Sequence, residues 1–268
     1  MKKVLTIAGS DSSGGAGIQA DLKTFSAHRV FGMSVITAVT AQNTQGVFAV
    51  QDIEAAMIEK QIEAIFEDIT VDAIKIGMVS RSQTIRRVAK GLKKYNARNV
   101  VIDPVMISTS GHYLLQPDAV EALVTCLLPL ATILTPNIPE AEELSSMKIH
   151  SLEDMEKAAR AIHELGPQNV LLKGGHRQEE ATDIFFDGKT CRHLSTPRIA
   201  TQNTHGTGCT LSAAIAALLA RGCSGQEAVT RAKEYIHTAI EHSFAIGKGV
   251  GPVHHFYNLY KGAGVLDE

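Results

Sequence analysis

Short β-branched segments alternate with longer amphipathic segments along most of this chain, and this alternation restricts the possible folds more than any other feature. It is typical of β-α-β units, in which helices cover both faces of a parallel sheet. We therefore predict an α/β fold with a mostly parallel central sheet flanked by helices. The expected strands are 4–8, 34–40, 73–76, 100–103, 133–135 and 170–173, and the expected helices are 17–28, 53–68, 81–95, 117–128, 152–165, 207–220 and 226–242.

One small antiparallel hairpin is expected near residues 182–194. Two strand-like runs, 182–186 and 190–194, flank the dipeptide Asp187-Gly188, which favours the tight turn of a hairpin. No internal repeat, low-complexity segment or long linker divides the sequence. A single domain over residues 1–268 is therefore expected, and a chain of this length can bury a full-sized core.

Charge and hydropathy argue against several classes of protein. The formal net charge is −2 and no block of like charges occurs, so we expect no nucleic-acid partner. No apolar stretch approaches the roughly 18 to 20 residues of a membrane helix, so we expect no membrane association. The apolar run near the N-terminus ends at Ser10 and Asp11, which favours a first strand over a signal peptide. A cytoplasmic location is therefore expected.

Cys209 is the most informative of the four cysteines, which show neither metal-site spacing nor a disulfide pattern. It lies in the run HGTGCT, residues 205–210, directly before a helix of small residues. Glycines at a helix start leave backbone N–H groups free, and these groups form an anion site with the helix dipole. The same field favours the thiolate, so we expect a depressed pKa for Cys209. The alternative is a small apolar side chain packed at a helix start.

Polar residues directly follow several expected strands, and in open α/β sheets ligands bind beyond the carboxyl ends of the strands. Asp103 ends one strand, and Asn137 and Glu140 follow the next. Each of them alone fits a helix cap or turn residue. Together they supply the oxygen ligands that Mg²⁺ prefers, which indicates a metal–nucleotide site. Lys173 ends a further strand, where its ammonium could lie along the surface or reach a phosphate.

The glycine-rich segment 9–21 follows the first expected strand. Gly15, Gly17 and Ala20 fit a relaxed dinucleotide-binding pattern, but the acidic residue expected about twenty positions further on is missing. Gly9 and Gly14 have the spacing of a P-loop, but the Gly-Lys-Ser/Thr ending is missing. A tight strand-to-helix turn is one remaining interpretation. A loop around a small polar substrate is the other, and we favour it.

Seven motifs occur in order across the chain, namely AGSDSSGGAGIQADLKTF, TAVTAQNT, DPVM, TPNIPEAEEL, KGGH, STPRI and HGTGCTLSAAIAA. They resemble the motifs of the hydroxymethylpyrimidine and hydroxymethylpyrimidine-phosphate kinases of thiamine biosynthesis, a branch of the ribokinase-like superfamily. The resemblance implies a ribokinase-like domain that transfers the ATP γ-phosphoryl group to 4-amino-5-hydroxymethyl-2-methylpyrimidine. A second transfer, to the resulting monophosphate, would give the diphosphate. ATP and Mg²⁺ are the implied cofactors, a monovalent cation is a further candidate, and a homodimer is the implied assembly.

The resemblance also implies roles for residues at matching positions. Cys209 stands where sugar kinases of the superfamily carry an aspartate base, which argues against a sugar substrate. It would accept the proton of the substrate hydroxyl, while the backbone of the same motif binds the transferring phosphoryl group. The implied catalytic residues are Gly206, Thr207, Gly208 and Cys209, the implied metal ligands are Asp103 and Glu140, and the implied nucleotide-binding residues are Asn137, Lys173 and Lys233.

Gln42 is the residue that we expect to select the substrate. A carboxamide offers a donor and an acceptor in one plane, which matches the edge of an aminopyrimidine. Related pyridoxal kinases tend to carry an apolar residue there, and a pyridoxine or pyridoxal kinase is the alternative enzyme. A binding protein without turnover is the third possibility. The other residues implied at the substrate pocket are Gly9, Ala16, Asp21, Thr40, Met78 and Val105.

Overall fold

The computed structural model describes residues 1–106, 115–116, 118–174 and 180–266. Their strands form one nine-stranded sheet with the order β3-β2-β1-β4-β5-β6-β7-β8-β9. The strands from β2 to β7 in this order run parallel, while β3, β8 and β9 pair antiparallel with their neighbours. This confirms the mostly parallel sheet and the hairpin. The bounds are β1 (Lys3–Ser10), β2 (Phe31–Asn43), β3 (Gly46–Asp52), β4 (Ala73–Ile76), β5 (Val100–Ile102), β6 (Ile133–Leu134), β7 (Val170–Leu172), β8 (Glu180–Phe186) and β9 (Cys191–Pro197).

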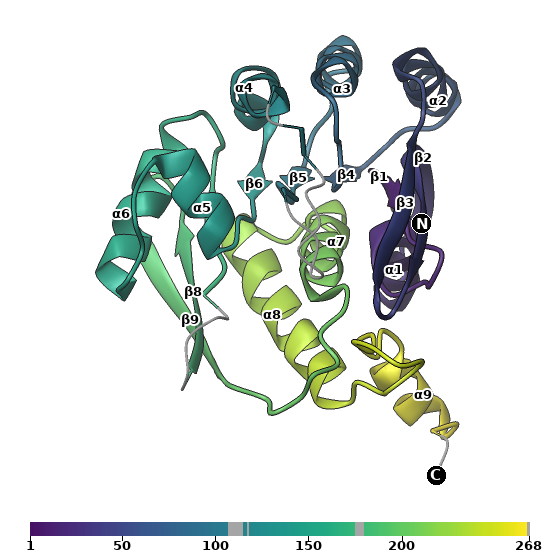
Figure 1. Ribbon diagram of the computed structural model, residues 1–268, viewed down its shortest axis with the longest axis vertical. Helices are drawn as coiled ribbons and strands as arrows, with labels where there is room; N and C mark the ends of the chain where they lie inside the picture. The colour runs from purple at the N-terminus through teal and green to yellow at the C-terminus, as the bar shows by residue number, and fades with distance from the viewer. Residues whose placement is uncertain (107–114, 117, 175–179, 267–268) are drawn as a thin grey trace.

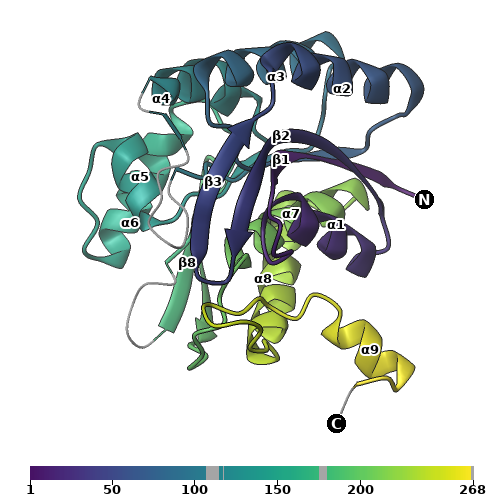
Figure 2. The same ribbon diagram turned by 45° about the vertical axis from the view of Figure 1, so that its right-hand side comes forward.

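Helices cover both faces of this sheet (Figure 1). Helices α2 to α6 pack into one core cluster, and α1, α7 and α8 pack into the cluster on the opposite face. Figure 2 shows α9 near the C-terminus, apart from both layers. Among the residues that the structure describes, no helix is both long enough and apolar enough to cross a membrane. The bounds are α1 (Gly17–Ala27), α2 (Ala55–Asp68), α3 (Ser82–Lys94), α4 (Ala119–Ala122), α5 (Ile138–Ser145), α6 (Leu152–His163), α7 (Thr207–Ala220), α8 (Gly225–Glu241) and α9 (Tyr257–Ala263).

Helix α7 is the central helix of its layer and carries the HGTGCT motif at its start. Every residue in 210–220 is buried, and the helix lies against β1, β4 and β5. A helix that is apolar on all sides is typical of such an enclosed position. Strands β4, β5 and β7 are buried throughout, as expected where helices cover both faces. The packing therefore fixes the start of α7 relative to the strand ends.

Four elements differ from the sequence expectations, and one of them is helix α9, which was not predicted. Strand β3 and helix α5 were not predicted, because β3 is largely exposed at the sheet edge and α5 has only eight residues. The single helix expected over 117–128 is wrong. It is a four-residue α-helix, a π-helical turn (Leu123–Leu127) and a 3₁₀ turn (Leu128–Leu130). Pro129 lies in this last turn and has no backbone N–H to extend an α-helix. Pro117 lies outside the described residues.

Candidate active site

The start of α7 forms the centre of the candidate site. Gly206, directly before the helix, has a left-handed φ of +76°. A Cβ at this position would lie 1.8 Å from the Gly15 carbonyl oxygen, so only glycine allows the two loops to approach so closely. The first backbone bond of the helix runs from the Thr210 N–H to the Gly206 carbonyl. The preceding N–H groups of Gly208 and Cys209 therefore lie in the unsatisfied first turn, where anions bind.

Asp103 and Lys173 form a partly buried ion pair beside this helix start. The Lys173 Nζ lies 2.8 Å from Asp103 Oδ1, and Thr135 Oγ1 donates to the same oxygen at 3.2 Å. A Cβ on Gly208 would lie 3.4 Å from Asp103 Oδ2 and 3.5 Å from Lys173 Nζ. Burial alone would lower the pKa of Lys173, but the Asp103 and Glu140 carboxylates outweigh it and raise that pKa. The helix start thus faces a protonated lysine and a carboxylate.

Asn137 and Glu140 form a capping box at the start of α5. The Glu140 N–H donates to Asn137 Oδ1 at 2.9 Å, and the Asn137 N–H donates to Glu140 Oε2 at 2.9 Å. The backbone of Asn137 also bridges to that of Lys173. Burial raises the pKa of Glu140 to about 7, with Lys173 opposing the shift and Asp103 adding to it. The cap interpretation is therefore confirmed, and it places Glu140 in the electrostatic environment of Asp103 and Lys173.

The donor chemistry of this group fits Mg²⁺. Within the described residues, no cluster of three or more acidic, histidine or cysteine side chains forms a self-sufficient metal site. Mg²⁺ does not require one, because it commonly takes one or two protein carboxylates and completes its shell with water and phosphate oxygens. Asp103 Oδ1 is engaged by Lys173 and Thr135, whereas Oδ2 faces Gly208. Asp103 and Glu140 are the two carboxylates suited to such a shell.

The expected low pKa of Cys209 is wrong. The side chain is half-buried, and burial raises the pKa of the thiol above its ordinary value of 9.0. The Lys75 ammonium opposes this shift, but the Asp21 and Asp103 carboxylates add to it. The field of the helix start therefore does not dominate. Desolvation and two nearby negative charges keep the thiol protonated at neutral pH.

Asp21 does not line an open pocket, in contrast to its implied role at the substrate. Its side chain and that of Lys75 are both fully buried, with Lys75 Nζ 2.9 Å from Asp21 Oδ2. Thr6 Oγ1 donates to the same oxygen at 2.6 Å. Asp21 Oδ1 is a buried side-chain oxygen that has no hydrogen-bond partner among the residues that the structure describes. Asp21 acts on the site through charge, since it and Lys75 have opposite effects on Cys209.

Lys233 is also held within the protein. Its Nζ donates to Asp183 Oδ2 at 2.6 Å and to the Ala181 carbonyl at 2.8 Å. The other Asp183 oxygen accepts the N–H of Gly174 at 2.9 Å. This buried lysine therefore supports the backbone after β7 and does not present a free ammonium to a nucleotide. The rest of the KGGH motif, residues 175–176, lies outside the described residues.

Four of the residues implied at the substrate pocket lie at the ends of three neighbouring strands, β2, β1 and β4. The Met78 sulfur would be 3.1 Å from a Cβ on Gly9, so it packs across the end of β1. Thr40 Oγ1 donates to the Ser10 carbonyl at 2.8 Å and lies 3.3 Å from Gln42 Oε1. Gln42 is half-buried and borders the glycine-rich segment. One edge of the site is therefore surrounded by Gly9, Met78, Thr40 and Gln42.

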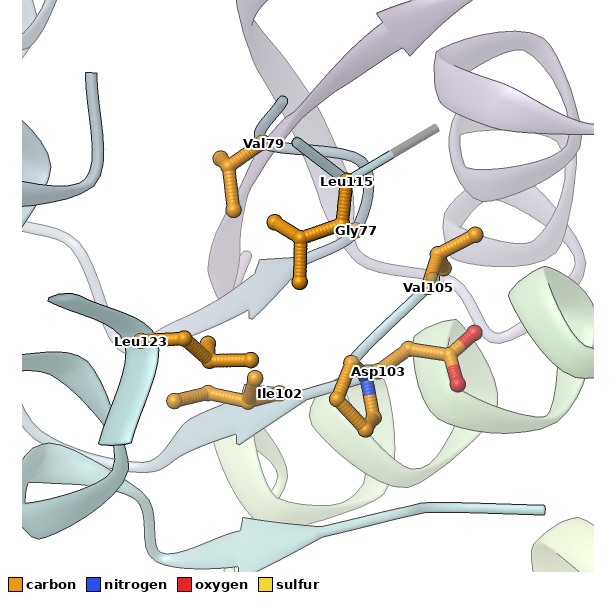
Figure 3. Close-up of a pocket in the computed structure, with 8 residues that line it drawn as sticks. Gly77, Val79, Ile102, Asp103, Val105, Leu115 and Leu123 are labelled. Carbon is orange, nitrogen blue, oxygen red and sulfur yellow. The ribbon is translucent and has the colours of Figure 1, made fainter. Parts of the chain in front are cut away.

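A small hollow lies between the ends of β4 and β5. Figure 3 shows Val79, Ile102 and Leu123 gathered on one side, with the Asp103 carboxylate directed away from them. Gly77, Val105 and Leu115 also line this hollow. Of the implied pocket residues, Val105 therefore lines this hollow. Ala16, much earlier in the chain, precedes α1 and donates its N–H to Asp11 Oδ2 at 2.8 Å.

A hydrogen bond between His205 and Asp11 was not predicted. The His205 Nε2 lies 2.8 Å from Asp11 Oδ2, and both side chains are buried. Asp11 Oδ1 also accepts the Ser13 N–H at 2.8 Å, an Asx turn that the Asp-x-Ser spacing could have indicated. His205 carried no such signal, because its partner is distant in the sequence. The pair joins the glycine-rich segment to the HGTG motif.

Comparison with known proteins agrees with this geometry. A family model described as phosphomethylpyrimidine kinase matches residues 11–254. A hydroxymethylpyrimidine/phosphomethylpyrimidine kinase of Rhizobium meliloti is 56% identical over 261 residues, 96% of this chain and 98% of that protein. A phosphomethylpyrimidine kinase structure from Clostridium difficile 630 is 55% identical, with a TM-score of 0.81, and covers 90% of this chain and 100% of its own.

A solved structure of a pyridoxal kinase is also similar. The ADP complex of the Bacillus subtilis enzyme is 44% identical, with a TM-score of 0.91 over 97% of this chain and 99% of that chain. These likenesses confirm the expected ribokinase-like fold. The match to the family model, together with the identity to the Rhizobium protein, establishes that this chain belongs to the phosphomethylpyrimidine kinase family.

Proposed function

We propose that this protein is a bifunctional, ATP-dependent kinase. It phosphorylates 4-amino-5-hydroxymethyl-2-methylpyrimidine and then its monophosphate, giving the diphosphate used in thiamine biosynthesis. The observation that carries this proposal is the convergence of Gly208, Asp103 and Lys173 at the start of α7. Phosphoryl transfer depends mainly on positioning and on neutralising charge at the transferring group. The name of the Rhizobium relative contains both kinase activities.

The HGTGC motif would bind the transferring phosphoryl group. The first-turn amides of Gly208 and Cys209 are oriented for an anion, and the Lys173 ammonium lies beside them. Gly206 and Thr207 shape the turn that presents these amides. Preorganised donors of this kind stabilise developing charge without reorganisation during the reaction. Asn137 would take part on the nucleotide side through its position beside Lys173.

Cys209 would accept the proton of the substrate hydroxyl. Because the pKa of its thiol is raised, only a small fraction is thiolate at neutral pH, but that thiolate is a strong base. Proton removal need not be far advanced in a loose transition state. The amides of the motif therefore contribute most to catalysis, and the sulfur tunes the rate with pH.

Mg²⁺ would be held by Asp103 and Glu140 together with waters and phosphate oxygens. When bound, it supplies positive charge that neutralises the phosphates of ATP. The carboxylate of Asp103 and the ammonium of Lys173 stay paired at 2.8 Å, which keeps both groups oriented toward the helix start. The ADP complex of the Bacillus subtilis pyridoxal kinase supports adenine-nucleotide binding by this fold.

The proposal also covers the assembly of the protein and its location in the cell. We propose a homodimer, supported by apolar side chains on the β2–β3 ribbon, where Phe48 is 69% and Val39 is 47% exposed. Exposed apolar groups of this kind are common at interfaces. We also propose a cytoplasmic location, where the four free thiols would stay reduced. Light scattering of the purified protein tests the dimer.

The identity of the reaction products tests the proposed activity. The protein is incubated with ATP and Mg²⁺, in K⁺ or Na⁺ buffer, and separately with the hydroxymethylpyrimidine, its monophosphate, pyridoxal and ribose. Mass spectrometry should find the monophosphate from the first acceptor and the diphosphate from the second. If the monophosphate gives no diphosphate, the protein is not a bifunctional kinase. Turnover of pyridoxal alone would replace the proposal with the pyridoxal kinase that the Bacillus structure represents.

A further inference from the structure

Three polar side chains from distant segments meet at the edge of the proposed pyrimidine site. Asp11 follows β1, Gln42 lies near the end of β2, and His205 precedes α7. His205 Nε2 is 2.8 Å from Asp11 Oδ2 and 3.4 Å from Gln42 Nε2. A Cβ on Gly15 would lie 2.3 Å from the His205 ring, so the ring packs directly against that backbone. The imidazole is therefore fixed in place by packing and by its carboxylate partner.

The carboxylate of Asp11 determines where the proton of His205 lies. Asp11 Oδ2 also accepts the N–H groups of Gly15 and Ala16, at 3.1 and 2.8 Å. Burial would raise the pKa of Asp11, but hydrogen bonds from His205, Ser13 and Ala16 outweigh it and hold that pKa below its usual range. The carboxylate is therefore ionised and carries no proton to donate. His205 Nε2 must carry the hydrogen of this bond.

This assignment has a consequence for the amide of Gln42. Two N–H groups cannot hydrogen-bond each other, so Gln42 Nε2 has no acceptor at His205 Nε2. Thr40 Oγ1 uses its only hydrogen on the Ser10 carbonyl, and it can therefore accept but not donate on the other side. Turning the carboxamide by half a rotation removes the N–H to N–H conflict, because its oxygen can share the one Nε2 hydrogen that Asp11 Oδ2 accepts at 2.8 Å, and its NH₂ group gains an acceptor at Thr40. Its oxygen then faces the His205 N–H, and its NH₂ group faces Thr40.

We propose that Asp11 and His205 are positioning residues that hold the Gln42 carboxamide with its oxygen toward His205 and its NH₂ group toward Thr40. The backbone of Gln42 is fixed as well, since its N–H and carbonyl both bond Ser12 Oγ, at 2.9 and 2.7 Å. The pair thereby determines the order in which the site presents acceptor and donor to a pyrimidine edge. This inference deepens the proposed function and rests on it.

The chemistry of the substrate makes that order important. A 4-aminopyrimidine has a donating amine beside an accepting ring nitrogen. The 4-oxo analogue has an accepting oxygen beside a ring N–H, so its donor and acceptor are exchanged. A fixed carboxamide matches one pattern and leaves unpaired polar groups against the other. A carboxamide that is free to turn would accept both.

Matched substitutions at His205 test this inference. His205→Gln keeps an amide that reaches Asp11, whereas the shorter His205→Asn ends before it. Each protein is titrated by calorimetry with the 4-amino and 4-oxo pyrimidines, and kcat and KM are measured for both. The wild type and His205→Gln should favour the 4-amino compound by about 100-fold, because the mismatched analogue leaves buried polar groups unpaired. His205→Asn should reduce this ratio to about fivefold or less, chiefly through KM.

His205→Ala serves as a second variant, and the exposed His193→Gln is the surface control. His205→Ala should also lose the preference, while His193→Gln should keep it. Equal ratios in His205→Gln, His205→Asn and His205→Ala would overturn the positioning role. A wild type that binds both pyrimidines equally would overturn it as well. If the wild type discriminates in binding but transfers no phosphoryl group, the proposed function fails and the inference survives.

Discussion

At the residue scale, the behaviour of Cys209 depends on its surroundings more than on its place at a helix start. Burial and the carboxylates of Asp21 and Asp103 raise its pKa, against the Lys75 ammonium. A helix-end dipole is worth only about 0.3 to 1 kcal/mol at exposed sites, so desolvation easily exceeds it. The position of the residue was predictable from the sequence, but its protonation state was not.

The raised pKa of Cys209 gives a prediction for the pH dependence of catalysis. Because the thiol deprotonates above 9.0, kcat/KM of the wild type should rise steadily between pH 7 and pH 9. Cys209→Ser should lose that rise and lower kcat by about 10²-fold, the lower range for a general base. Steady-state rates across this range measure both effects. Full activity of Cys209→Ser at neutral pH would rule out the role of base.

The buried pair of Lys75 and Asp21 gives a prediction for stability. Both side chains are fully buried, so Lys75→Met leaves an unpaired carboxylate that should cost about 3 to 5 kcal/mol of unfolding free energy. Adding Asp21→Asn removes that charge and should restore more than half of the loss. Urea unfolding of both variants provides the measurement. A double variant no more stable than Lys75→Met would show that the loss has another source.

At the scale of elements, the first turn of α7 is joined to the segment before α9. His255 Nε2 lies 3.0 Å from Thr210 Oγ1, one residue after Cys209, and Tyr235 donates to the His255 carbonyl at 2.8 Å. Burial lowers the pKa of His255 to about 4. The C-terminal segment is thereby connected to the helix that carries the anion site, through a histidine that is neutral in the folded protein.

This histidine makes stability depend on pH in a defined window. The pKa of His255 is lower in the folded than in the unfolded protein, so the neutral histidine stabilises the fold at pH values above the unfolded pKa of about 6.5. This contribution to stability is lost as the pH falls through about 4. The wild type should lose at most about 3 kcal/mol of unfolding free energy between these pH values because of His255. His255→Gln should not show this loss. Chemical unfolding at several pH values measures the difference, with His193→Gln as the surface control. Parallel pH profiles of wild type and His255→Gln would contradict this account.

At the scale of the whole molecule, the parallel sheet, the hairpin and the long helices were predictable from periodicity. The edge strand β3 and the short helix α5 were not, because exposure and short length weaken their patterns. The sequence placed Asp103 and Lys173 after strands at the same edge of the sheet, but their direct contact was not predicted. Contacts that depend on three-dimensional packing were missed. The Asp11–His205 bond spans 194 positions, and the pairing of Lys233 with Asp183 spans 50.

Gly208→Ala tests most directly the central claim that the phosphoryl group is transferred over the start of α7. The added Cβ meets Asp103 Oδ2 at 3.4 Å and Lys173 Nζ at 3.5 Å, ordinary contacts that the fold accommodates. Replacing a helical glycine with alanine should raise the free energy of unfolding by up to about 1 kcal/mol. The Tm should therefore stay unchanged or rise. The methyl group would nevertheless fill the space assigned to the γ-phosphoryl group. We predict a kcat at least about 100-fold lower, on the scale of a lost transition-state donor. An unchanged kcat in a folded Gly208→Ala protein would contradict the account.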